Sequence, residues 1–367
     1  MTEALPVTDS PDLETTHTSD DTFQLREIQL AFRNRGIPAE GLRLPITPTG
    51  MHYLLNHFDI PYVDAASWKL TIGGRVGTPL SLDLDDLRRR PAVTFPVTFE
   101  CAGNGRVFAK PRPVNQPWLH GAVSTAEWTG TPLGPILEEA GLADGAREVL
   151  FTGLDRGIQF DVDQYYQRSL TVAEAMRDEV ILAYEMNGAP LEPQHGFPLR
   201  LVVPGWYGMT NVKWLDRIEV IDEAFDGVQM QFYRETSGPE DAGAPVETMK
   251  VRALMAPPGI VDFPSLQRRV EAGSVTLVGR AWAGRSQVAR VEVSTDDGAS
   301  WHDAVLDDPI GPYAWRGWRY EWHATQGEHM LCTRATDSEG NVQPPEPVWS
   351  YYGVGNNGMA RQPVIVV

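Results

Sequence analysis

The segment VTFECAGNGR (97–106) carries one of the two cysteines of the sequence, Cys101, in a setting suited to chemistry. An apolar run leads into a loop in which Gly103, Gly105 and Arg106 follow this cysteine. Glycine lets a backbone come close to a ligand, and a nearby guanidinium favours the thiolate form of a cysteine. A thiolate can act as a nucleophile or as a soft ligand to a transition metal. Taken alone, the pattern also fits a cysteine packed in a core.

A second segment, QHGFPLRLVVPGWYGMTNVKWL (194–215), gathers polar side chains around an apolar strand. His195 and Arg200 stand at its start, and Asn211 and Lys213 follow the glycine-rich loop at its far end. These donors suit a large polyanionic ligand lying across the edge of a sheet. A histidine on the surface and a lysine exposed to solvent would give the same sequence pattern. The segment therefore indicates a cofactor site without deciding it.

Composition excludes several classes of function. The 367 residues include 31 Lys+Arg and 49 Asp+Glu, a net charge of −18, which argues against nucleic acid or an anionic membrane as a partner. Cys101 and Cys332 are too few for a disulfide scaffold and form no C-x-x-C pair, so we expect a reducing compartment, the cytoplasm. No apolar stretch is long enough for a transmembrane helix, and no HExxH or GxxxxGK motif occurs.

Mixed strand and helix patterns must position these residues up to about residue 243. Six acidic residues and no Lys or Arg in residues 1–25 predict a disordered tail. Apolar, alternating or β-branched runs predict strands at 67–74, 97–99, 149–154, 180–186 and 199–203. Short helices are predicted at 81–90 with Ser81 as N-cap, at 133–141 ending in Gly141, and at 171–178. The fold class of residues 26–243 is therefore α+β.

Beyond a Gly, Pro and acid-rich linker at 238–247, helical periodicity stops and short strands recur about every ten residues. Their number predicts an immunoglobulin-like β-sandwich over 244–367. The predicted strands are SVTLVGRAW, VARVEVST, WHDAVL, WRYEWHA, HMLCTRAT, VWSYYG and QPVIVV. Cys332 lies inside one of them, which favours a small buried apolar residue over a reactive thiol.

Together these segments resemble the sulfite oxidase family of molybdenum-cofactor oxidoreductases. ECAGNGR (100–106) resembles the loop that carries the molybdenum-ligating cysteine. GLD (153–155), LAYEMNG (182–188), HGFPLRLVVPG (195–205) and VKWL (212–215) follow in the family's order. The resemblance extends from about residue 40 through the sandwich.

The resemblance implies a molybdopterin-binding catalytic domain, followed by a sandwich domain through which two chains form a homodimer. It implies oxygen-atom transfer at a Cys-ligated molybdenum centre, with sulfite as the default substrate and an external electron acceptor. No haem is expected, since the sequence has no C-x-x-C-H motif. Cys101 would ligate the metal and, with Arg106 and Tyr233, form the catalytic group, while Trp118 would line the substrate pocket. The cofactor would be held by Tyr53, Asn56, His57, Cys101, Asp155, His195, Arg200, Asn211, Val212 and Lys213.

Three positions depart from the family pattern in a way that concerns the substrate. Leu55, Asn115 and Tyr313 stand where sulfite-oxidising members are basic, and each lost charged hydrogen bond weakens the binding of a small dianion. A less anionic substrate, a sulfoxide or another oxyanion, is therefore an alternative to sulfite. A non-catalytic binding protein of the same fold is a further alternative. Thiol-dependent hydrolysis at Cys101 has no base placed by a recognisable motif.

Overall fold

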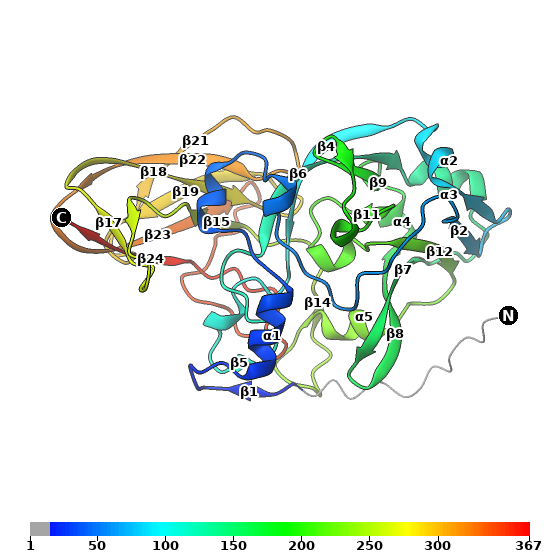
Figure 1. The fold of residues 1–367 in the computed structure, drawn as a ribbon, viewed down its shortest axis with the longest axis horizontal. Coiled ribbons are helices and arrows are strands. Elements are labelled where there is room, and N and C mark those ends of the chain that lie inside the picture. The colour runs from blue at the N-terminus through cyan, green and yellow to red at the C-terminus, as the bar shows by residue number, and fades with distance from the viewer. Residues whose placement is uncertain (1–14) are drawn as a thin grey trace.

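The computed structural model describes residues 15–367 as two lobes, shown side by side in Figure 1. The two five-stranded sheets lie in the larger lobe, and β15 to β24 lie in the smaller one, with the C-terminus at its far end. Within the described residues, no helix is both long and apolar enough to cross a membrane. The predicted α+β class is confirmed.

Two five-stranded sheets build the larger lobe. One sheet has the order β3-β2-β12-β7-β8, in which only β12 and β2 run parallel. The other has the order β10-β9-β6-β4, and β11 also pairs with β9. Their strands are β2 (Leu70–Gly74), β3 (Leu80–Leu82), β4 (Val93–Glu100), β6 (Val123–Pro132), β7 (Glu148–Gln159), β8 (Val162–Thr171), β9 (Ile181–Met186), β10 (Ala189–Pro190), β11 (Arg200–Val202) and β12 (Leu215–Ile221).

Short helices connect these strands, and their caps correct one prediction. Ser81 is not an N-cap, because it lies in β3; the Asp83 carboxylate instead accepts the Asp86 amide hydrogen and caps the helix. The helix ending before Gly141 is confirmed, whereas the one predicted at 171–178 is shorter and capped by Thr171. The helices are α1 (Leu25–Arg33), α2 (Leu84–Arg88), α3 (Gly134–Ala140), α4 (Val172–Ala175) and α5 (Val228–Phe232).

The predicted acidic tail is only partly within the described chain, since residues 1–14 lie outside it. Its last part is ordered, contrary to the prediction: strand β1 (His17–Thr18) pairs with β5 (Arg112–Pro113). The ring centroids of His17 and Tyr351 are 4.5 Å apart. Contacts with residues far away in the sequence thus order this end of the tail, which its composition could not indicate.

The smaller lobe is a sandwich of two sheets with the orders β15-β18-β22-β21 and β16-β17-β24-β23-β19-β20. Its strands are β15 (Arg252–Met255), β16 (Ile260–Val261), β17 (Arg268–Val270), β18 (Gly273–Trp282), β19 (Val288–Ser294), β20 (His302–Asp303), β21 (Val305–Leu306), β22 (Arg316–Ala324), β23 (Gly327–Asp337) and β24 (Arg361–Val366). The strand predicted at VWSYYG (348–353) is wrong, because this segment is irregular apart from a turn at Tyr351 and Tyr352. Between the sheets of the two lobes along the chain, β13 (Arg234–Glu235) pairs with β14 (Ala244–Pro245). The linker predicted at 238–247 therefore forms the turn and the second strand of this hairpin.

The segment after β23 returns to the larger lobe before β24 begins. There the Gly355 amide donates to the Ala102 carbonyl at 2.8 Å. Trp282, Trp315 and Tyr352 also join one apolar core with Phe99. The loop after β4 is therefore packed against both lobes.

Candidate active site

Cys101 follows the last residue of β4 and begins a tight loop between the lobes. Its amide donates to the Ala122 carbonyl, and its own carbonyl accepts the Asn104 amide hydrogen, both at 2.9 Å. Gly103 leaves room for the Arg106 side chain, because a Cβ there would lie 2.5 Å from Nη2 of Arg106 and the guanidinium would have to shift. The glycine thus lets the guanidinium lie close to the loop that carries the thiol.

Arg106 brings an uncompensated positive charge close to this thiol. The guanidinium is buried, and it donates to the carbonyls of Gly353 and Gln116, both at 3.1 Å, rather than to a carboxylate. Burial raises the pKa of the Cys101 thiol, and the charge of Arg106 acts in the opposite direction. Without a metal the thiol is therefore protonated, and a bound metal cation would hold it as a thiolate.

A buried cavity beside Cys101 has a second guanidinium in its wall. Arg200 donates to the carbonyls of His195 (3.1 Å) and Asn211 (3.2 Å), and its Cζ lies 4.7 Å from the ring centroid of Trp128. Burial lowers the pKa of Arg200 to about 10, so it stays charged at neutral pH. Its Nε has no acceptor within residues 15–367.

Lys213 and Asp155 are two further ionisable residues that line this cavity. The ammonium group donates to the carbonyls of Leu55 and Gln194, both at 3.0 Å, and to the side-chain oxygen of Asn56. Burial lowers the pKa of Lys213, whereas burial raises the pKa of Asp155 to about 7 against the opposing charge of Lys213. Oδ1 of Asp155 has no donor in the described part of the chain.

Three histidines are buried around the same cavity. The Nδ1–H of His52 donates to the Tyr53 carbonyl at 2.9 Å, and its ring lies edge-on to that of His195 with 5.5 Å between centroids. His57 shares a 3.0 Å hydrogen bond with the hydroxyl of Tyr233. Burial lowers the pKa values of His52 and His57 to about 3 and that of His195 to about 2, so all three are neutral at pH 7.

These groups fit a planar polar cofactor that carries an anionic group. Buried polar atoms normally have a hydrogen-bond partner, yet Nε2 of His52, Nε2 of His195, Oδ1 of Asp155 and Nε of Arg200 have none among residues 15–367. All four residues line the cavity beside Cys101. A pterin would offer donors and acceptors to them, and its phosphate would neutralise the surrounding cations.

A second pocket of about 290 Å³ meets this cavity at Cys101. Leu55, His57, Cys101 and Tyr233 line both spaces. The thiol therefore lies where a buried cofactor cavity and a second pocket come together.

Comparison with known proteins decides the family. Residues 57–229 match the oxidoreductase molybdopterin binding domain, and residues 246–366 match the Mo-co oxidoreductase dimerisation domain. The chain is 36% identical to mitochondrial sulfite oxidase of Mus musculus over 88% of this chain and 62% of the mouse protein. It is 33% identical to sulfite oxidase of Arabidopsis thaliana over 86% of this chain and 87% of the plant protein. This chain belongs to the sulfite oxidase family.

A solved structure agrees with this family and with the fold. The sulfane dehydrogenase SoxCD from Paracoccus pantotrophus superposes with a TM-score of 0.79 at 26% identity, covering 95% of this chain and 87% of that one. The predicted resemblance is confirmed over most of the chain. The chain spans about three fifths of the length of the mouse relative, 62%.

The structure brings most of the residues predicted from the family together. The cavity beside Cys101 is lined by Tyr53, His57, Cys101, Asp155, His195, Arg200, Asn211, Lys213 and Tyr233. Asn56 contacts Lys213, and Arg106 and Trp118 line the second pocket. Val212 does not line either space, because its side chain packs in the core of the larger lobe.

Of the three positions that depart from the family pattern, one lies away from the second pocket. Leu55 and Asn115 line the second pocket, as expected for positions that concern the substrate. Tyr313 does not, since its phenol lies beside Arg177 and Glu179 and its carbonyl accepts the Thr98 amide hydrogen. Its place in the sequence therefore says nothing about substrate charge.

Sequence reasoning missed several residues that line the cavity or support the Cys101 loop. His52 and Tyr166 line the cofactor cavity, and His52 could have been found because it directly precedes Tyr53. Glu100 was also missed, although it directly precedes Cys101. Its carboxylate accepts hydrogen bonds from Nη1 of Arg252 and Nε1 of Trp282, both at 2.8 Å. Those donors come from the smaller lobe, and no local signal in the sequence pointed to them.

Proposed function

We propose that this chain is a molybdenum-cofactor oxidoreductase that transfers an oxygen atom to a small sulfur compound. The observation that supports the proposal is the position of Cys101, whose thiol lies at the junction of a polar, cation-lined cavity and a second pocket and could there ligate a metal. A bound molybdenum cofactor would supply a two-electron redox centre that exchanges an oxygen atom between water and substrate. Sulfite is the default substrate because the relatives of this chain include sulfite oxidases.

The chain's own residues would bind and orient the reactants. Arg200 and Lys213 would neutralise the cofactor phosphate, while His195 and Asp155 would make hydrogen bonds to its polar atoms. Arg106 would attract an anionic oxygen of the substrate at the Cys101 loop.

Tyr233 would act at the junction of the two spaces. Burial raises the pKa of the Tyr233 hydroxyl, so it stays protonated and is a hydrogen-bond donor at neutral pH. His57, which is neutral, holds this hydroxyl in place. The pair would position the substrate oxygen without adding charge.

Partners and location belong to the same proposal. The match of residues 246–366 to a dimerisation domain supports a homodimer. Electrons would pass to a separate acceptor. The cytoplasmic location expected from the two cysteines stays a prediction, with both thiols free in the structure.

The proposal is tested by metal and pterin analysis of the purified protein together with Cys101→Ser. We expect near-stoichiometric molybdenum, reduction of ferricyanide by a sulfur substrate, and a variant that keeps its pterin but loses turnover by at least a thousandfold. Cys332→Ser is the matched control, because Cys332 lies in β23 of the smaller lobe, and it should retain full turnover. Full activity in Cys101→Ser would contradict the proposal.

A further inference from the structure

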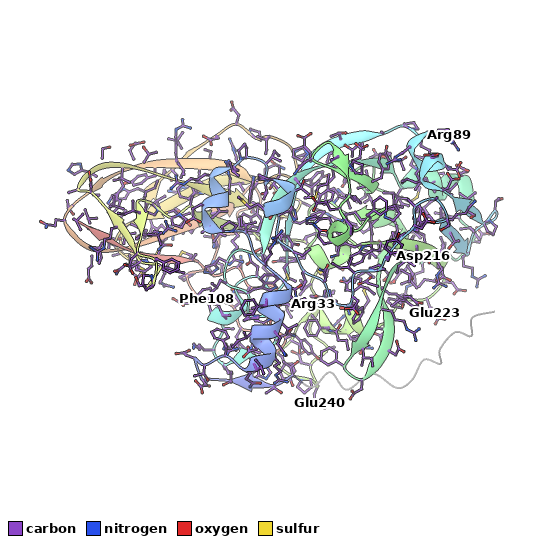
Figure 2. The ribbon with its side chains drawn as sticks, viewed as in Figure 1. Arg33, Arg89, Phe108, Asp216, Glu223 and Glu240 are labelled. Carbon is purple, nitrogen blue, oxygen red and sulfur yellow. The ribbon has the colours of Figure 1, made fainter. Side chains whose placement is uncertain are left out.

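The second pocket, at Cys101, is the space that a substrate would occupy. Helix α1 contributes Leu30, the β7–β8 hairpin contributes Ile158 and Phe160, and α5 contributes Phe232. Figure 1 shows these three elements on the same side of the molecule. Arg33, the last residue of α1, donates a hydrogen bond to the carbonyl of Phe58, which also lines the pocket. Arg33 is labelled near the centre of Figure 2.

The pocket offers a single charged side chain. Arg106 is the one Lys, Arg, Asp or Glu among its described lining residues. Two of the five N–H groups of this guanidinium donate to backbone carbonyls, and the others have no acceptor within residues 15–367. The pocket is therefore matched to one negative charge next to Cys101.

The side-chain oxygens of three pocket amides, Asn115, Gln116 and Gln159, accept hydrogen bonds within the protein. Asn34 donates to Gln116 at 3.0 Å, and Gln229 donates to Gln159 at 2.7 Å. The side-chain oxygen of Asn115 accepts the amide hydrogen of Gln116 at 2.7 Å. A second anionic oxygen would therefore meet neutral amide N–H groups, and no second cation among the described lining residues.

The remaining wall is apolar and encloses more space than an inorganic oxyanion needs. Its apolar residues are Leu30, Leu55, Phe58, Val114, Trp118, Ile158, Phe160 and Phe232. A volume of about 290 Å³ is close to the lower limit of pockets for organic ligands. Burying an apolar substituent of the substrate against this wall would stabilise the complex.

We propose that the preferred substrate is an organic sulfinate, R–SO₂⁻, whose sulfur is oxidised to the sulfonate. The inference rests on the proposed function and deepens it. One water oxygen forms the new S–O bond: R–SO₂⁻ + H₂O gives R–SO₃⁻, two protons and two electrons. Two equivalents of a one-electron acceptor take the electrons. The sulfinate oxygens contact Arg106, and the apolar R group packs against the apolar wall of the pocket.

This class matches the pocket better than sulfite does. Sulfite is partly dianionic near neutral pH, so its second negative charge would have no cation to pair with in this pocket. Sulfite also has no apolar part that could pack against the apolar wall. A sulfoxide has the apolar part but no full charge for Arg106. A sulfinate satisfies both features.

The first test compares substrates with the molybdenum-loaded protein and ferricyanide as the acceptor. We expect kcat/KM for benzenesulfinate to exceed that for sulfite at least tenfold, with methanesulfinate between them. Leu55→Arg adds a second cation to the pocket and should reverse the order of benzenesulfinate and sulfite. Val305→Arg adds the same charge at an exposed site in β21 and should leave the order unchanged.

Ile158→Ser keeps the test informative if Leu55→Arg fails to fold. Ile158 is 71% exposed at the mouth of the pocket, so its loss should not disturb the core. The variant should lower kcat/KM for benzenesulfinate at least threefold and leave methanesulfinate within twofold. An equal change for both substrates would overturn the role of the apolar wall.

Binding gives a readout that does not depend on turnover. In calorimetric titrations of the oxidised protein, benzenesulfonate should bind at least tenfold more tightly than sulfate. Tighter sulfate binding, or turnover of sulfite without turnover of either sulfinate, would overturn the sulfinate proposal and leave the proposed function standing. Reduction of a sulfoxide by reduced viologen, with sulfinates unreactive, would also overturn it. Protein without molybdenum, or loaded protein inactive on every sulfur compound, would contradict the proposed function instead.

Discussion

At the scale of single residues, the cofactor cavity contains charges that folding alone does not favour. Arg200 is buried against aromatic rings and carbonyls, and within residues 15–367 it has no carboxylate partner and Oδ1 of Asp155 has no donor. Burying unpaired charges and polar atoms costs free energy in the empty protein. These residues are therefore explained by the ligand that they would hold.

We predict that Arg200→Met separates cofactor binding from stability. The variant should lose at least nine tenths of its pterin, because a phosphate would lack its buried guanidinium. The free energy of unfolding of the cofactor-free protein should not fall, since a desolvated charge is removed. Pterin fluorescence and urea unfolding measure the two effects. Arg361→Met, at a partly exposed ion pair, is the control, and full pterin content in Arg200→Met would contradict the assignment.

The neutral histidines predict how stability depends on pH. Unfolded histidine binds a proton below about pH 6.5, whereas the folded pKa values of His52, His57 and His195 are about 3, 3 and 2. Acid therefore favours the unfolded chain, and stability should be lost as the pH falls from 6.5 toward 3. Each ring contributes up to about 1.4 kcal/mol per pH unit.

Urea unfolding of the cofactor-free protein between pH 4 and 7 measures this slope. His57→Gln should reduce the slope of the unfolding free energy against pH by up to the contribution of one histidine, because one ring no longer titrates. Comparing the variant with its parent cancels the contribution of Asp155, whose raised pKa of about 7 acts in the opposite direction over this range. His302→Gln, on exposed strand β20, is the control. An unchanged slope in His57→Gln would contradict a buried, neutral ring.

At the scale of elements, a buried ion pair joins strand β4 to strand β15. Glu100 and Arg252 are 2.8 Å apart and almost fully shielded from solvent. Arg252 also donates to the carbonyls of Asn104 and Asn356, both at 3.2 Å. The smaller lobe thus positions the loop that begins at Cys101.

We predict that Arg252→Met destabilises the chain by about 3–5 kcal/mol, because it leaves the Glu100 carboxylate buried without its cation. The shift of the urea midpoint measures this effect. Glu100→Gln in the same chain should recover part of the loss, since no unpaired charge remains. Arg319→Met, which breaks an exposed pair with Asp307, should cost at most about 1 kcal/mol. Equal effects of the two arginine variants would show that the buried pair is not important for the fold.

At the scale of the whole molecule, a net charge of −18 coexists with buried cations around one cavity. Global charge keeps the surface acidic, while the local potential at Arg106, Arg200 and Lys213 is positive. The acidic surface thus argues against nucleic acid without excluding an anionic cofactor.

We predict a homodimer that depends on the smaller lobe, whose sequence matches a dimerisation domain. The turn between β16 and β17 exposes Phe263 (89% exposed) and Leu266, and monomers rarely expose neighbouring apolar residues without a partner. Sedimentation should give twice the chain mass of 40.7 kDa. Phe263→Asp together with Leu266→Asp should give folded monomers whose unfolding midpoint no longer depends on protein concentration. A monomeric parent protein, or dimers in this variant, would contradict the prediction.

The sequence alone determined the family, the α+β class and most residues around the cofactor cavity. Cys101 and the run from His195 to Lys213 were readable because they occupy short stretches with fixed spacing. Helix caps were less accurate, since Ser81 and Asp83 are both good N-cap residues and only pairing in β3 separates them.

Only the tertiary structure decided which distant residues meet. Tyr313 lies away from the pocket, Glu100 meets Arg252 across 152 positions of sequence, and the apolar pocket is assembled from α1, the β7–β8 hairpin and α5. Charge and hydrophobicity act through space, whereas a sequence motif reports only neighbours along the chain. The cofactor class could therefore be predicted from the sequence, while the expected substrate depends on the folded pocket.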